Sequence, residues 1–229
     1  MSSPPTLIVF DIDGTLLDST TAHLTALTSV LRGMKLNPDS KPWATYRHYT
    51  DSGVLDELLE DTRGSGATAV DLACLDRELR AEFAALTSTA PLSEIAGARR
   101  LLKHLEGSDD IRVAFATGSM RGVALQKLRA LGLEPDAHLI ATGSEFLARE
   151  HIVLEVLNRG TERWGQPLSV VLVGDGAWDE RVARTLGVPI VGVETGLHRF
   201  GSGADLVVPD LRRLSDQDLR AAARPFALR

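Results

Sequence analysis

Short apolar runs constrain the fold of this 229-residue chain more than any other feature. They are rich in valine and isoleucine, are bounded by turn residues, and lie at residues 7–10, 111–115, 168–173, 189–193 and, more weakly, 206–208. Runs that are apolar on both faces are typical of interior strands in a parallel sheet covered by helices. Helical patterns alternate with them at residues 97–105, 121–131, 152–164 and 179–186. We therefore predict an α/β fold built on a doubly wound, Rossmann-like parallel sheet.

The segment between the first two strands has a different pattern. It contains no comparable strand run, and its helical periodicity lies at residues 22–31, 54–59 and 70–86, separated by turn-forming stretches. An insertion of this size is usually a small domain of its own. We expect an all-helical domain over residues 17–92 and an α/β core over residues 1–16 and 93–229.

Charge and cysteine content exclude several classes of function. The formal net charge of −6 disfavours a general nucleic-acid binder, which needs a basic face along the phosphate backbone. The single cysteine, Cys74, cannot form an internal disulfide. The first residues lack a basic leader, and no apolar run is long enough for a membrane helix. We expect a cytoplasmic protein with neither a nucleic-acid nor a membrane partner, and the sequence leaves the oligomeric state open.

Three predicted strands end in clusters of polar and glycine residues. These are residues 11–15 (Asp-Ile-Asp-Gly-Thr), 117–119 (Thr-Gly-Ser) and 173–179 (Val-Gly-Asp-Gly-Ala-Trp-Asp). Ligands of open α/β sheets bind just beyond the carboxyl ends of the strands, so clusters at these positions are expected to meet.

Each cluster alone has a structural and a functional interpretation. Asp11 and Asp13 point the same way from an extended chain, which is costly without a cation between them, but Asp13 could instead cap a turn. Thr117 and Ser119 precede a predicted helix and could bind an anion there, or simply cap that helix.

The third cluster places Asp175 four residues before Asp179, where both could hold a divalent cation or Asp179 could only start a helix. Together, the three clusters resemble the haloacid dehalogenase superfamily in their order, spacing and strand context. The resemblance covers nearly the whole chain and includes a helical cap inserted after the first cluster. That arrangement is similar to the phosphoglycolate phosphatase-like and β-phosphoglucomutase-like branch.

The resemblance implies a role for each cluster residue. Asp11 would be the nucleophile that accepts the phosphoryl group as an aspartyl phosphate, and Asp13 the general acid and base. We expect neighbouring carboxylates to raise the pKa of Asp13, because the first step needs it protonated. The phosphoryl group or the substrate phosphate would be held by Thr117, Gly118, Ser119, Gly14 and Thr15.

The resemblance also implies a Mg²⁺ cofactor. Its ligands would be the Asp11 carboxylate, the Asp13 carbonyl oxygen and Asp175, with Asp179 in an outer supporting role. A divalent cation would offset the repulsion between a carboxylate and a phosphate dianion. Oxygen-only ligands without a Cys/His cluster favour Mg²⁺ over zinc.

One family element departs from its usual form. The branch normally carries a lysine, often followed by proline, ahead of the helix that precedes the last motif. Arg149 lies at about the right distance before Asp175 and could pair with Asp11, although a guanidinium fork differs from an ammonium. The alternative is a solvated cation at a helix start. Lys127 and Arg129 are interpreted as the exposed face of the preceding helix.

Asp13 favours one reaction class within the resemblance. Dehalogenases and phosphonoacetaldehyde hydrolases of the superfamily lack this carboxylate, and the latter also need a cap lysine. The lysines of the insertion, Lys35 and Lys41, both lie in loop-like context. We predict a Mg²⁺-dependent phosphatase that acts on a small phosphorylated metabolite. The alternatives are a sugar phosphomutase and a non-catalytic binding protein that retains the fold.

The insertion contains further candidates. His23 falls where relatives place a histidine near the hinge, which faces the substrate or couples cap closure to acid/base readiness. The alternative is a polar residue on an exposed helix face. Trp43 is interpreted as core of the insertion, with Arg47 and His48 left open. Trp178, beside the third cluster, is interpreted as a packing residue.

Overall fold

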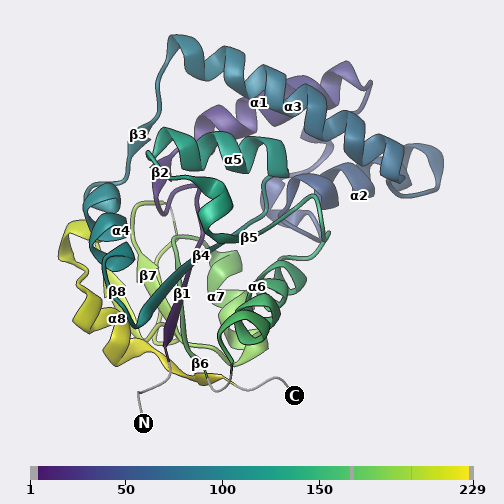
Figure 1. Cartoon of the computed structure of the whole chain (residues 1–229). Helices are drawn as coiled ribbons and strands as arrows, with labels where there is room; N and C mark the ends of the chain where they lie inside the picture. The colour runs from purple at the N-terminus through teal and green to yellow at the C-terminus, as the bar shows by residue number, and fades with distance from the viewer. Residues whose placement is uncertain (1–4, 166–167, 197, 227–229) are drawn as a thin grey trace.

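The computed structural model describes residues 5–165, 168–196 and 198–226. A seven-stranded sheet forms its centre, with parallel strands in the order β5-β4-β1-β6-β7-β8 and with β9 antiparallel to β6 (Figure 1). The strands are β1 (Thr6–Phe10), β4 (Ile111–Thr117), β5 (Leu139–Thr142), β6 (Leu168–Gly174), β7 (Ile190–Val193), β8 (Leu206–Val208) and β9 (Arg224–Phe226). The predicted α/β fold is therefore confirmed.

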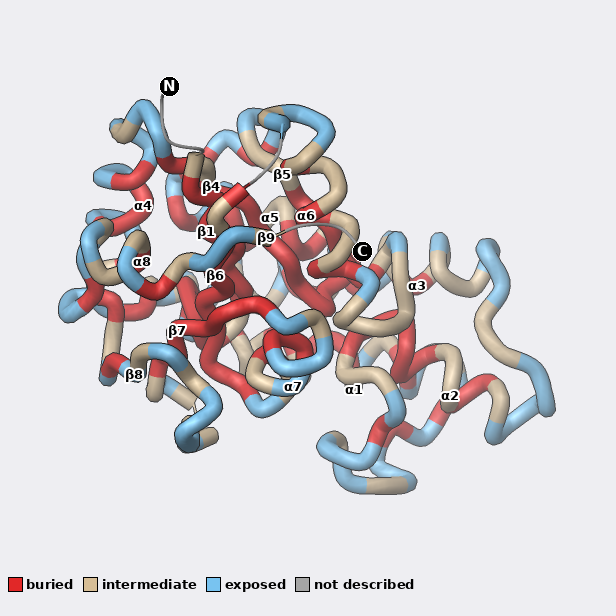
Figure 2. The backbone as a smooth tube through the Cα atoms, turned by 90° about the horizontal axis from the view of Figure 1, so that it is seen from below, coloured by how far each residue is buried: buried red, intermediate tan, exposed pale blue. Residues whose placement is uncertain are grey.

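Helices cover both faces of the sheet. They are α4 (Ala98–Glu106), α5 (Arg121–Ala130) and α8 (Asp216–Ala222) on one face, and α6 (Arg149–Trp164) and α7 (Ala177–Leu186) on the other. Alternate residues of β1 supply the two cores: Ile8 and Phe10 pack with the first group of helices, and Leu7 and Val9 with the second. The buried interior runs along these central strands (Figure 2). None of the helices in the described ranges is long and apolar enough to cross a membrane.

Residues 17–92 contain three further helices, and we call this stretch the helical unit. It consists of α1 (Thr20–Gly33), α2 (Asp51–Arg63) and α3 (Ala69–Thr89), with short 3₁₀ turns at Pro38–Ser40 and Trp43–Thr45. Two short strands, β2 (Leu17–Asp18) and β3 (Ser93–Glu94), pair antiparallel where the chain enters and leaves it. The division of the chain at residues 17–92 stays a prediction.

The apolar core of the helical unit extends beyond the unit itself. Leu27, Leu55 and Phe83 pack with Met120 and Val123, which belong to the start of α5. Helices α3 and α5 accordingly lie side by side (Figure 1). This packing holds the helical unit against one end of the sheet.

The register of the central strands brings the three polar clusters together. Phe10 of β1 lies opposite Phe115 of β4 and Val173 of β6. The three strands are neighbours and parallel, so the residues that follow them emerge at one edge of the sheet. Strand order reverses at β1, which is where ligands bind in open α/β sheets.

Candidate active site

Three acidic side chains meet at that edge. Carboxylate oxygens of Asp11, Asp175 and Asp179 lie within 4.8 Å of one another, and all three residues are buried. The Asp11 N–H donates to the carbonyl of Val173 at 2.9 Å, which fixes the residue at the end of β1. Oδ2 of Asp11 is buried and has no hydrogen-bond partner among the described residues. The nucleophile candidate therefore presents an uncommitted oxygen.

Crowding and burial raise the pKa values of these three acids. Burial, with Asp179 and Asp13 nearby, raises the pKa of Asp11 to about 7, although Arg149 acts in the opposite direction. Burial and Asp11 likewise raise the pKa of Asp175 to about 7, and burial raises that of Asp179 to about 6 despite Arg149. Carboxyl groups with these pKa values lack sufficient positive charge around them. A bound divalent cation would supply it.

Arg149 is the one guanidinium in contact with this cluster in the described part of the chain. It begins α6, and its Nη1 lies 3.2 Å from Asp11 Oδ1 and 2.9 Å from Asp179 Oδ1. Its Nε donates to the carbonyl of Tyr49 at 3.2 Å. The side chain is only 12% exposed, so the alternative of a solvated helix-start cation is wrong.

Gly14 and Thr15 lie behind Asp175. Gly14 has φ +78°, and a Cβ there would overlap the Asp175 carboxylate, so the position requires glycine. The Thr15 hydroxyl donates to Asp175 Oδ1 at 3.1 Å. The Gly14 N–H donates to the carbonyl of Leu17 at 2.8 Å. Both residues position Asp175, and their contact with phosphate stays a prediction.

Asp179 both belongs to the acidic cluster and caps the start of a helix, the two interpretations that the sequence left open. Its Oδ2 accepts from the N–H of Gly176 at 3.0 Å, which closes a capping arrangement at the start of α7. Its Oδ1 faces Arg149 within the acidic cluster.

The second cluster does not cap α5 through its side chains. The N-cap residue of α5 is Met120, without a side-chain capping bond. Thr117 Oγ1 instead accepts from the N–H of Ser119 at 3.2 Å, and Ser119 Oγ donates to Asp13 at 3.0 Å. The carbonyl of Gly118 accepts from a backbone N–H of the helical unit. The helix-cap alternative for Thr117 and Ser119 is therefore wrong.

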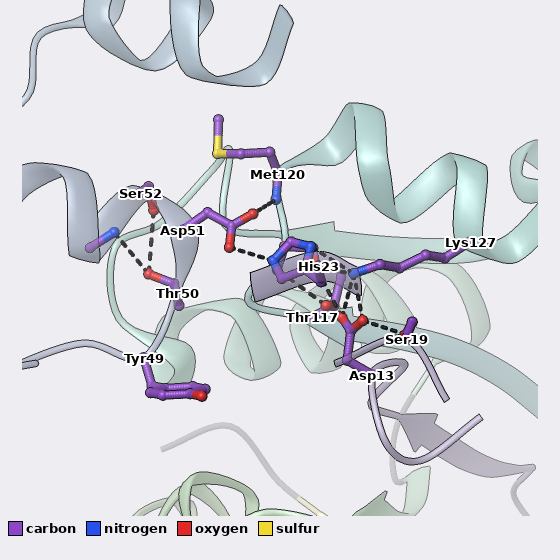
Figure 3. A network of polar contacts seen from close by, with 12 residues as sticks. Asp13, Ser19, His23, Tyr49, Thr50, Asp51, Ser52, Thr117, Met120 and Lys127 are labelled. Carbon is purple, nitrogen blue, oxygen red and sulfur yellow. Dashed lines mark hydrogen bonds and ion pairs between the residues drawn. The ribbon is translucent and has the colours of Figure 1, made fainter. Parts of the chain in front are cut away.

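The position of Lys127 differs most from what the sequence predicts. The side chain is fully buried, and its Nζ lies 2.6 Å from the Asp13 carboxylate, 2.8 Å from Ser119 Oγ and 3.1 Å from His23 Nδ1 (Figure 3). The interpretation as an exposed helix face is wrong for Lys127 and agrees with the structure only for Arg129. The sequence does contain a sign of this, because Lys127 continues the apolar stripe of α5 made by residues 123, 124 and 128.

The pKa expected for Asp13 is wrong in direction. Burial alone would raise it, but the adjacent Lys127 ammonium and the hydrogen bonds from Lys127 and Ser19 hold the pKa of Asp13 well below its usual range. The Ser19 hydroxyl donates to Asp13 Oδ1 at 2.5 Å. Asp13 is thus ionised and firmly oriented in this arrangement.

His23 connects the helical unit to this ion pair. It is buried on α1, and its Nε2 lies 2.8 Å from Asp51 Oδ1 (Figure 3). An ammonium has only donors, so His23 Nδ1 accepts from Lys127 and Nε2 carries the hydrogen donated to Asp51. Asp51 also accepts from the Met120 N–H at 2.7 Å. The exposed-face alternative for His23 is wrong, and sequence reasoning missed Asp51 because it resembles an ordinary first-turn acid.

A pocket lies between the helical unit and the sheet edge. Asp13, Ser119 and Arg149 line its core side. Helices α1 and α2, Trp43 and residues 49–51 line the other. Tyr49 and Trp178 stack across one flank with ring centroids 4.2 Å apart and planes 10° apart.

Two other residues of the insertion have separate places. Trp43 packs against the core of the helical unit, and Arg47 is exposed and pairs with Glu60 at 2.9 Å.

Comparison with known families identifies the class of this protein. The family model for haloacid dehalogenase-like hydrolases matches residues 8–193, from β1 through β7. The chain therefore belongs to the haloacid dehalogenase-like hydrolase family and is an enzyme of that family.

Individual relatives are more distant. A phosphoglycolate phosphatase of Mesorhizobium japonicum is 26% identical over 202 residues, which make up 86% of this chain and 85% of the relative. A CbbY variant from Rhodobacter sphaeroides in complex with xylulose-(1,5)bisphosphate superposes with a TM-score of 0.71 at 18% identity, covering 94% of this chain and 99% of that one. A hydrolase from Pseudomonas syringae gives a TM-score of 0.67 at 22% identity, covering 90% and 94%. The two structures share the fold.

Proposed function

We propose that this haloacid dehalogenase-like phosphatase hydrolyses a small phosphate monoester through an aspartyl-phosphate intermediate on Asp11, with Mg²⁺ as cofactor. The observation that carries the proposal is the buried, unpartnered Oδ2 of Asp11 beside Arg149 and two further carboxylates. The name of the Mesorhizobium relative supports phosphate-ester chemistry. The helical unit, residues 17–92, would be the cap domain over a core formed by residues 1–16 and 93–229.

The donor set fits a hard divalent cation. Asp11, Asp175 and Asp179 bring three carboxylates together against one guanidinium, which leaves two negative charges. Carboxylate oxygens are the ligands that Mg²⁺ prefers. Asp11 and Asp175 would hold the ion with the Asp13 carbonyl, and Asp179 would support them. A bound cation would lower the repulsion between the nucleophile and a phosphate dianion.

Two displacements at phosphorus make up the reaction. An Asp11 oxygen bonds to phosphorus while the ester P–O bond breaks, and the departing oxygen takes a proton from Asp13. Lys127 Nζ is 2.6 Å from the Asp13 carboxylate and would supply that proton. A water molecule, deprotonated by Asp13, then attacks phosphorus and releases Asp11 as a carboxylate with free phosphate. The proton taken from water passes from Asp13 back to Lys127, which restores the ion pair.

Residues around Asp11 and Asp13 would position the phosphoryl group. Arg149 would hold a phosphoryl oxygen beside Asp11, and Thr117 with the Gly118–Ser119 backbone would hold the others. Closure of the helical unit would exclude bulk water. Asp51 would take part by keeping the helical unit docked at Met120.

The direct test is Asp11→Asn. We expect phosphate release from a generic aryl phosphate to fall at least about 10³-fold, because an amide oxygen is a poor nucleophile. The circular dichroism spectrum should be unchanged. Asp18→Asn, at an exposed position in β2 a few residues further on, is the matched control and should keep wild-type turnover. Near-normal turnover in Asp11→Asn would refute the mechanism.

A further inference from the structure

We infer that the leaving group of the substrate is uncharged and mainly apolar and carries no second anionic group. This inference rests on the proposed function and narrows its substrate class. Because Asp13 would protonate the leaving oxygen, the leaving group must extend from Asp13 into the pocket that Asp13 lines. The walls of that pocket therefore select it.

Apolar side chains make up most of the wall opposite Asp13. Leu24 and Leu27 come from α1, and Val54 comes from α2. Aromatic rings of Trp43 and Tyr49 continue the surface. Such a wall gains free energy from buried hydrocarbon and offers nothing to a charged group.

Two cations lie near the pocket floor, and both already have partners; of the two, Arg149 lines the pocket itself. The three N–H groups of Lys127 are matched by Asp13, Ser119 and His23. Arg149 faces Asp11, Asp179 and the Tyr49 carbonyl. The described part of the helical unit adds no lysine or arginine to this wall. A carboxylate or second phosphate on the leaving group would lose its hydration there without gaining a counterion.

Most polar side chains of the wall already form hydrogen bonds within the protein. Asp51 accepts from His23 and Met120, and the Thr50 hydroxyl donates to the carbonyl of Leu147 at 2.6 Å. Thr20 adds one hydroxyl to the lining. A polyhydroxylated leaving group would need more donors and acceptors than the wall offers.

An outer pocket adjoins this one and is lined by three arginines. Arg47 and Arg181 line only the outer pocket, whereas Arg149 and the stacked rings of Tyr49 and Trp178 line both pockets. Arg47 is further engaged by Glu60. Arg47 and Arg181 do not line the inner pocket, so they offer no counterion to a leaving group held there.

The test compares three primary alkyl esters, so that intrinsic reactivity is similar. Benzyl phosphate carries an apolar ring, 2-phosphoglycolate a carboxylate, and glucose 6-phosphate a polyol. We expect kcat/KM for benzyl phosphate to exceed that of each of the others by about tenfold or more. Asp11→Asn is the negative control: any phosphate that this variant still releases comes from another site and is subtracted.

A charge placed in the wall should shift this preference. Leu24 is half-buried, so Leu24→Lys can keep its ammonium hydrated near the pocket. We expect the ratio of kcat/KM for benzyl phosphate over 2-phosphoglycolate to fall at least about tenfold. Thr25→Lys adds the same charge at the next, exposed residue, outside this pocket, and should change the ratio less than about threefold.

Binding provides a measurement independent of turnover and of the variants. Calorimetry on the wild-type protein with Mg²⁺ should give tighter binding for benzylphosphonate than for phosphonoacetate, again by about tenfold. An Asp11-dependent preference for 2-phosphoglycolate or glucose 6-phosphate would overturn the inference while leaving the phosphatase proposal intact. If that preference disappears in Arg181→Gln, the outer pocket recognises the anion. No phosphate release from any ester would contradict both.

Discussion

At the scale of single residues, the buried ammonium of Lys127 is the feature that most needs a physical explanation. It is fully buried on α5, and each of its hydrogens has an acceptor, so its charge is offset mainly at Asp13. A buried pair of this kind costs more to break than it contributes when formed. Lys127 therefore fixes Asp13 in place more than it stabilises the fold.

Removing one partner of this pair should be costly. We expect Lys127→Met to lower the free energy of unfolding by about 3–5 kcal/mol, because Asp13 is then a buried carboxylate without its counterion. The double variant Lys127→Met with Asp13→Asn should lose less than the sum of the two single variants, by about 1–3 kcal/mol. Urea denaturation of all four proteins measures both quantities.

The same helix offers a control for this cycle. Arg129→Met removes an exposed cation from α5 and should change stability by no more than about 0.5 kcal/mol. Strict additivity between Lys127→Met and Asp13→Asn would mean that the pair is not coupled.

Single-residue environments were the least predictable from the sequence. The residues that oppose the effect of burial on the pKa of Asp13 include Lys127, which is 114 positions away along the chain. No local pattern around Asp13 encodes that contact. The apolar stripe of α5 does mark Lys127 as buried, but not which acid it meets.

At the scale of elements, the start of α2 joins the helical unit to the core. Thr50 caps α2 by accepting from the Gly53 N–H at 3.0 Å, and the Asp51 N–H donates to the Gly118 carbonyl at 2.9 Å. The Asp51 carboxylate adds contacts to His23 and Met120. One helical turn thus connects α1, α2 and the loop before α5.

We expect Asp51→Ala to lower the free energy of unfolding by about 2–3 kcal/mol, because the buried donors of His23 and Met120 lose a charged acceptor. KM should also rise, since the docked position of the helical unit shapes the pocket. Chemical denaturation and steady-state kinetics measure the two effects.

The opposite end of α2 provides the comparison. Asp61→Ala removes an exposed carboxylate of the same helix, 3.6 Å from Lys41, and should be nearly neutral. Equal losses in Asp51→Ala and Asp61→Ala would argue against a docking role for Asp51.

Elements were more predictable than residues. The five predicted strands and the helices of the core are present, mostly within a few residues of their expected ends. Apolar runs identify central strands because both faces are buried. The edge strand β5 has only four residues and was missed, as were β2, β3 and β9, whose two or three residues are too few for a period.

At the scale of the whole molecule, stability should depend on pH through the acidic cluster. Asp11 and Asp175 have pKa values of about 7 in the folded protein, against 3.8 for an ordinary aspartate. Between about pH 4 and pH 7, the folded state then binds more protons than the unfolded state. Without a divalent cation, these groups should therefore reduce stability as the pH rises through that window.

Mg²⁺ should reverse this loss, because it binds the deprotonated cluster. At a hundredfold excess over its Kd, we expect about 2.7 kcal/mol of stabilisation at pH 8. This corresponds to a rise in Tm of about 5–10 °C. At pH 5 the shift should be much smaller, since protons compete for the same oxygens. Differential scanning calorimetry with and without Mg²⁺ at both pH values measures the difference.

Asp175→Asn is the control for the metal effect. It should abolish most of the Mg²⁺-dependent shift at pH 8 while leaving the fold intact. Equal Mg²⁺ shifts at pH 5 and pH 8, or a full shift in Asp175→Asn, would contradict binding at this cluster.

The apolar core of the helical unit includes two residues that lie outside residues 17–92 in the sequence. Met120 is the N-cap of α5 and Val123 lies in its first turn, yet both are buried among the side chains of α1 to α3. The unit is therefore continuous in sequence but not self-contained in space. Exchanging residues 17–92 between relatives would transplant a pocket wall without the surface that supports it. A graft intended to carry substrate preference from one protein to another would have to include the first turn of α5 as well.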